Sequence, residues 1–144
     1  MAIASEICNS FKVEILTATH NFTASSGDTF NLALYTSSAT LGKATTAYTT
    51  SYEVATATGY TAKGKALTSV TPVLSTDTAV CDFSNVSWTS ASFTARGCLI
   101  FNDDASGDPS VCSIDFGGDK TVTSGTFTVE FPAAAAGTAI IGIA

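Results

Sequence analysis

Short segments in which apolar and polar residues alternate recur along most of this chain. In TFTVEF (126–131), Phe127, Val129 and Phe131 share one face and the residues between them share the other. A repeat of two residues is the period of a β-strand, whose successive side chains point to opposite faces of a sheet. Turn residues separate the segments, and this arrangement predicts antiparallel strands.

Seven segments carry this strand signature. They are TFNLALY (29–35), KALTSVTPVL (65–74), TAVCDFSNVSWT (78–89), SFTARGCLIF (92–101), VCSIDFGG (111–118), GTFTVEF (125–131) and TAIIGIA (138–144). In the first, Phe30, Leu32 and Leu34 share one face; in the third, Val86 and Trp88 do. Regularly spaced short strands are typical of sandwiches and barrels rather than of βαβ units. We therefore expect an all-β fold, a single antiparallel β-sandwich of the jelly-roll or immunoglobulin-like kind.

The N-terminal segment has a different period. Ile7, Phe11 and Ile15 recur every four residues and Ser5 can act as a cap, which predicts a short helix over residues 5–17. We expect a helical arm over 1–20 and one sandwich domain over 21–144. The apolar stripe must pack either on its own sandwich or on a neighbouring molecule, and it is a candidate interface. If it serves a neighbour, deletion of the arm leaves a soluble domain that no longer assembles.

A long loop over 36–64 carries tyrosines and few other large apolar residues. Long ordered loops are often functional, and tyrosine is favoured at interfaces. Tyr48, Tyr52 and Tyr60, with Tyr35 at the start of the loop, are therefore further candidate interface residues. The alternative is that Tyr48 and Tyr52 cap the edge of the domain's own core. Tyr48→Ala and Tyr52→Ala distinguish the two, because an interface role weakens assembly more than monomer stability.

The composition restricts the classes of partner. Charged residues make up only 12% of the chain, with a net charge of −6, while there are 24 Thr and 17 Ser. Six scattered cations do not supply the basic surface that nucleic acid or an anionic membrane requires. Charge depletion is a property of interface cores. The composition favours a subunit that covers much of its surface in an assembly, the alternative being a weakly charged soluble domain.

Targeting signals are not expected in this sequence. MAIASEICNSF lacks the basic start and the apolar run of a secretory signal. The apolar C-terminal stretch AAAAGTAIIGIA has 12 residues, whereas a membrane span requires about 20. We expect a protein that is made and kept in a cytoplasm.

Four cysteines, Cys8, Cys81, Cys98 and Cys112, have no metal-binding spacing. Cys98 and Cys112 flank the turn NDDASGDPS and invite a disulfide. We expect Leu99 and Phe101 to share a buried face with Cys112, Ile114 and Phe116, which places Cys98 on the opposite face. Four free, buried or half-buried thiols are therefore predicted.

Residues that could support catalysis or bind metal are few. His20 is the only histidine, and no nucleophile motif accompanies it. The loop NDDASGD (102–108) suits a β-turn, with a Ca²⁺ site as the alternative. DFGGDK (115–120) is interpreted as a hairpin turn, and Asp82, Asp115 and Glu130 as strand residues that do not form a catalytic group. We expect no enzyme activity, no metal and no cofactor.

Three strings carry a family resemblance over about residues 10–144: HNFTASSGDTFNLALYTSSAT, TSYEVATATGYTAKGKALTSVTP, and SFTARGCLIFND followed by DFGGDKTVTSGTFTVEFP. They resemble small β-rich virion proteins of tailed bacteriophages. The resemblance implies a capsid cement or decoration subunit, often a homotrimer, bound to the major capsid protein on the outer lattice of the virion.

Two other functions stay open. A tail or neck component, which would bind tail proteins, is also structural and β-rich. A receptor-binding module would require an exposed aromatic surface or a groove lined by Tyr35, Tyr48 and Tyr60.

Overall fold

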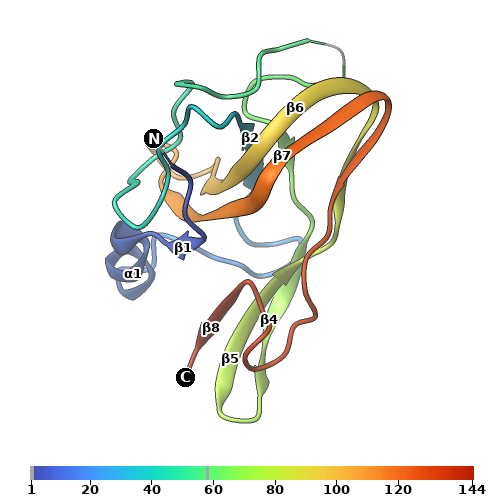
Figure 1. Cartoon of the computed structure of the whole chain (residues 1–144). Helices are drawn as coiled ribbons and strands as arrows, with labels where there is room; N and C mark the ends of the chain where they lie inside the picture. The colour runs from blue at the N-terminus through green and yellow to red at the C-terminus, as the bar shows by residue number, and fades with distance from the viewer. Residues whose placement is uncertain (1, 58) are drawn as a thin grey trace.

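The computed structural model of the chain describes residues 2–57 and 59–144. Its elements are β1 (Glu6–Ile7), α1 (Asn9–Leu16), β2 (Phe30–Tyr35), β3 (Lys65–Ala66), β4 (Ser69–Ser75), β5 (Thr78–Phe83), β6 (Val86–Asn102), β7 (Ser110–Val129) and β8 (Ile141–Ile143). The strands form two antiparallel sheets, one ordered β1-β7-β6-β2-β3 and the other β4-β5-β8 (Figure 1). This architecture confirms the expected all-β sandwich with a short N-terminal helix.

Two of the expected strands divide where the chain passes between the sheets. The 65–74 segment separates into β3 and β4, and the 78–89 segment into β5 and the start of β6. In the second segment two exposed residues, Ser84 and Asn85, separate the buried Phe83 and Val86, which marks the crossing only as a short break in the alternation. Membership of a sheet is decided by which backbone groups find partners, and this depends on the whole fold.

A long hairpin of β6 and β7 dominates the larger sheet and bends sharply along its length (Figure 1). The expected turn at 115–120 is wrong: this segment lies inside β7, where Asp115 pairs with Gly97 and Lys120 with Ala95. Four residues of β7 therefore face one residue of β6, and Gly117 takes a positive φ of 80°. Glycine and aspartate here form a bulge that bends a continuous strand.

Both faces of β2 are buried. Phe30, Leu32 and Leu34 enter the main core, as their alternation predicts, while Ala33 and Tyr35 enter a second core on the other face. The 36–64 loop covers this second face and contributes Ala39, Leu41 and Tyr48 to it. The loop is thus a structural layer of the domain.

The helix is shorter than expected. It spans Asn9–Leu16, and Glu6 and Ile7 instead form β1, which pairs with Ser113 and Cys112 of β7. The N-cap is Cys8, without a side-chain cap hydrogen bond, so the predicted role of Ser5 is wrong. Pairing with the open edge of β7 gives the backbone of this short segment hydrogen-bond partners that it would otherwise lack.

All four cysteines are buried and free, as predicted, although the expected reason was wrong. Cys98 pairs with Ile114, and Ile100 with Cys112, so these residues share the face of the main core. Leu99 and Phe101 lie on the opposite face in the second core. Both faces of this part of β6 are apolar. Hydrophobic alternation alone therefore could not assign Cys98 to the main core or to the second core.

Candidate interaction surfaces

The apolar stripe of the N-terminal segment packs on its own domain. Phe11 is buried in the main core against Phe22, at a ring separation of 5.9 Å, and Ile7 and Ile15 pack around it. The remainder of the N-terminal segment is also attached to the sandwich, since the backbones of Ala2 and Ala4 bond to Leu41. Residues 1–20 therefore do not form a detached arm, and the side chain of Phe11 is not available to a partner.

The tyrosines differ in their exposure. Tyr35 and Tyr60 are buried, and Tyr48 is half-buried and stacks on Phe101 at 4.7 Å. Tyr52 is 54% exposed and is the one of the four that presents most of its ring to solvent. The hydroxyl groups of Tyr35, Tyr48 and Tyr60 all form hydrogen bonds inside the fold.

Glu53 organises the long loop. Its carboxylate accepts hydrogen bonds from the Tyr48 hydroxyl at 2.6 Å, the Tyr60 hydroxyl at 2.8 Å and the Lys63 backbone N–H at 2.8 Å. The Tyr60 hydroxyl in turn accepts from the Leu34 N–H. Burial, reinforced by the Glu53 carboxylate, raises the pKa of Tyr48 to about 12. This network attaches the loop to β2 and is structural.

Two of the three carboxylates of the acidic loop at 102–108 are paired with one lysine of the same chain. The Lys63 ammonium lies 2.7 Å from Asp103 and 2.8 Å from Asp108, and these two hydrogen bonds raise the pKa of Lys63. Among the described residues, no three acidic, histidine or cysteine side chains are grouped as metal ligands. The backbone of the loop forms turns, in line with the β-turn interpretation.

His20 is buried beside the same loop. Its Nδ1 lies 3.1 Å from the Asn102 amide nitrogen, which also donates to Asp28 at 2.8 Å. Nδ1 must then be the acceptor, which places the ring proton on Nε2, 3.6 Å from a Glu14 oxygen. Burial lowers the pKa of His20, because the charged ring loses hydration.

The four thiols are buried, and of the three carboxylates considered above Asp115 is paired with a cation. Burial raises the pKa of Cys81 and of Cys98 to about 12 each, and thiols in this state are poor nucleophiles. Asp115 lies 2.9 Å from Arg96, and this hydrogen bond lowers the pKa of its carboxyl group.

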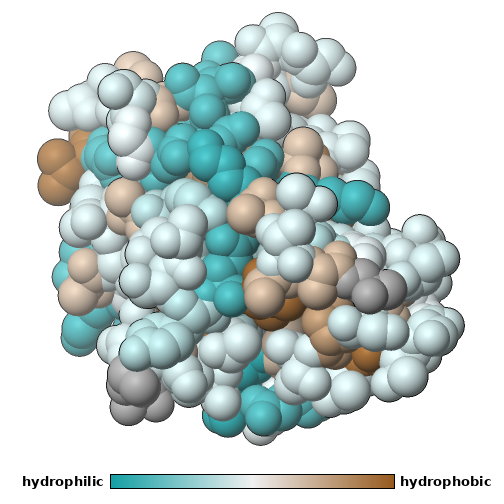
Figure 2. Space-filling model, turned by 90° about the horizontal axis from the view of Figure 1, so that it is seen from above, coloured by the Kyte–Doolittle hydropathy of each residue, from teal (hydrophilic) through white to brown (hydrophobic). Residues whose placement is uncertain are grey.

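Part of the surface combines low charge with exposed apolar side chains. Figure 2 shows one face on which most atoms are pale, charged and amide groups form a band, and apolar side chains gather in one area. Among the described residues, the large apolar side chains that are most exposed are Val13, Leu16, Tyr52, Val70, Val73, Leu74 and Ile143. Three of these, Val70, Val73 and Leu74, lie on β4, an edge strand.

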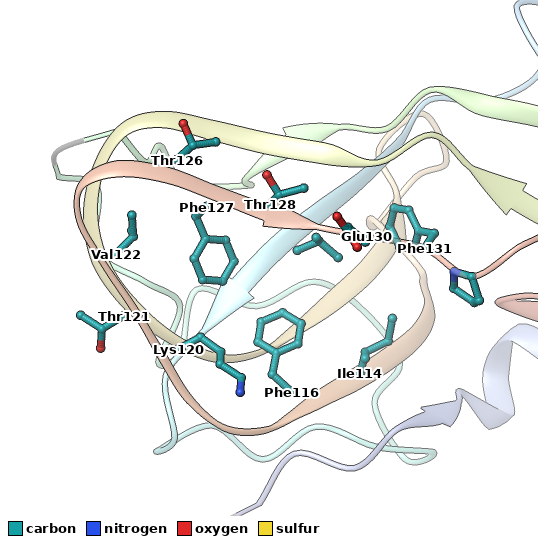
Figure 3. A pocket seen from close by; sticks show the side chains of 12 residues that line it. Ile114, Phe116, Lys120, Thr121, Val122, Thr126, Phe127, Thr128, Glu130 and Phe131 are labelled. Carbon is teal, nitrogen blue, oxygen red and sulfur yellow. The ribbon is translucent and has the colours of Figure 1, made fainter.

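A groove of about 520 Å³ opens between the two ends of β7 (Figure 3). Its apolar lining comes from Ile114 and Phe116 on the first part of the strand and from Phe127 and Val129 on the last part. Phe116 and Phe127 point toward one another, with ring centroids 6.1 Å apart. We call this site the β7 groove. The alternation of 126–131 predicted its apolar face, but only the bend of β7 brings that face opposite Phe116.

Two polar features complete the β7 groove. Lys120 lies on one side, and Glu130 lies near its other end (Figure 3). Exposed threonines, including Thr126 and Thr128, form its rim. An apolar floor with a few polar groups at its margin is suited to binding an apolar surface.

Comparison with protein-family models, with curated proteins and with solved structures found no match to this chain. No described helix is both long and apolar enough to cross a membrane.

Proposed function

We propose that this protein is a non-enzymatic structural component of a phage virion, most simply a capsid cement subunit that binds the outer capsid lattice. The observation that carries the proposal is the combination of exposed apolar residues on β4 with a fold whose thiols and histidine are buried. The sequence resemblance to small phage virion proteins supports the same class. Such a subunit acts by adding contact area, and binding only to the assembled shell stabilises it by mass action.

The charge of the chain supports an outer position. A net charge of −6 is compatible with a surface that faces away from packaged DNA. The partner in this proposal is the major capsid protein, and the location is the mature virion. A tail or neck position is the alternative, supported by the edge strands β4 and β8, which are able to pair between subunits of a ring.

The deciding experiment is to label the protein on intact virions of the phage that encodes it and to locate the copies by electron microscopy. Copies distributed over the whole shell, at regular lattice positions, are the expected result. Copies confined to the tail axis or neck would replace the capsid proposal with the tail alternative. Virions without the protein would overturn both.

A further inference from the structure

The β7 groove lies at the margin of the main core, where apolar side chains are only partly covered. Ile114, Phe116 and Phe127 pack against the main core from one side, yet each remains partly exposed in the groove. Strand β1 pairs with β7 only at Cys112 and Ser113. Beyond these two residues the edge of β7 opposite β6 has no strand neighbour in the described part of the chain. A partner that reaches the groove therefore meets apolar side chains and a free strand edge together.

The β4–β5 hairpin has complementary properties. It projects from the body of the molecule (Figure 1), and its turn consists of Thr76 and Asp77. Leu74 is 71% exposed and Val73 is 54% exposed, both close to the turn. Exposed aliphatic side chains on a projecting edge strand are costly unless a partner covers them.

We propose that the β4–β5 hairpin of one copy of this chain occupies the β7 groove of a second copy. Leu74 would enter the apolar floor, and Asp77 at the turn would approach Lys120 beside it. Both charged side chains are exposed, and neither has an opposite charge within 4.0 Å among the described residues. The hairpin therefore matches the groove in its apolar contact and is opposite in charge to its Lys120 side, while Glu130 lies near the other end.

The helix α1 fits the groove less well than the hairpin. Leu16 is 86% exposed, but Lys12 lies beside it in the same surface depression. Insertion of this part of α1 would add a second ammonium group to a groove that already carries Lys120, and like charges at an interface oppose binding. The hairpin brings a carboxylate instead.

The contact joins two different surfaces of the chain, so two copies exchange it reciprocally or several copies close a ring. Self-association of this kind is a property of the isolated chain and does not depend on the location of the protein in a virion. Its outcome and the outcome of the virion labelling experiment are therefore independent.

The first test is the molar mass of the purified full-length protein, measured by light scattering after size exclusion over a dilution series. A mass that is a multiple of the monomer at high concentration is expected for the natural chain. The double substitution Val73→Ser with Leu74→Ser should give the monomer mass, because it removes the apolar contact while both positions are exposed in the monomer. The matched control is Val13→Ser, which changes an exposed apolar residue on α1 and should leave the association unchanged.

The second test is a charge exchange. Asp77→Lys alone and Lys120→Asp alone should each weaken association by about five- to tenfold at low salt, through like-charge contacts. The chain that carries both substitutions should regain the natural association. Lys12→Asp makes the same change of charge outside the groove and should not reproduce the loss.

Three results would overturn the assignment. They are a natural chain that remains a monomer at every concentration, a serine variant that still associates, and a double charge variant that does not regain association. Circular dichroism of each variant checks that its fold is intact, so that a loss of association is not a loss of folding.

Discussion

At the scale of single residues, two networks of polar side chains hold loops in place. Glu53 gathers two tyrosine hydroxyls and a backbone N–H, and Lys63 connects two of the three aspartates of the 102–108 loop. The strand pattern of the sequence does not predict either network. Both replace solvent contacts with hydrogen bonds, which is the requirement for burying polar groups.

Glu53→Ala should lower the free energy of unfolding by about 2–3 kcal/mol, because three donors lose a charged acceptor and the Tyr60 hydroxyl is buried. Urea unfolding followed by Trp88 fluorescence measures the loss. Glu130→Gln changes an exposed carboxylate and serves as the control, with little expected effect. Equal stability of Glu53→Ala and the natural protein would contradict the structural role of this network.

His20 should titrate below its ordinary value of about 6.5, because burial disfavours the charged ring despite the nearby Glu14 and Asp28 carboxylates. Since the unfolded chain then binds the proton more readily, stability should fall as pH decreases below about 6.5 and toward the folded-state pKa. The ring signals of this single histidine in proton NMR report its pKa directly. A measured pKa above 6.5 would contradict the prediction.

At the scale of elements, the N-terminal segment belongs to the sandwich. Cys8 and Phe11 are buried in the main core, and β1 extends the larger sheet. We therefore expect that deletion of residues 1–20 does not leave a soluble domain, in contrast to the expectation from the sequence. Removal would expose the core and one edge of β7.

Phe11→Ala should cost about 3–5 kcal/mol of unfolding free energy, the range for removal of a buried aromatic side chain. Chemical unfolding of the full-length variant provides the value. Val13→Ala, on the exposed side of the same helix, should change stability by less than about 0.5 kcal/mol. Similar small effects of the two substitutions would show that α1 does not support the core.

At the scale of the whole molecule, two cores lie on opposite faces of β2 and share the central strands. The main core lies between the sheets and α1, and the second lies under the 36–64 loop. Because β2 and β6 contribute to both, loss of either core exposes the same strands. The domain should therefore behave as one cooperative unit.

Thermal or urea unfolding should give a single transition, with coincident curves for Trp88 fluorescence and far-ultraviolet circular dichroism. Trp88 is the only tryptophan and lies in the main core, whereas circular dichroism reports all the strands. An early transition seen only by circular dichroism would show that the loop and the second core unfold separately.

The sequence by itself determined the strand-rich class and the inward faces of the segments at 29–35 and 126–131. These properties follow from local alternation, which does not depend on distant contacts. The tertiary structure decided the split of strands between sheets, the face of Cys98, the β1 pairing of Glu6 and Ile7, and the bend that forms the β7 groove. Each of these depends on which backbone edge or apolar face is available after the rest of the chain has packed.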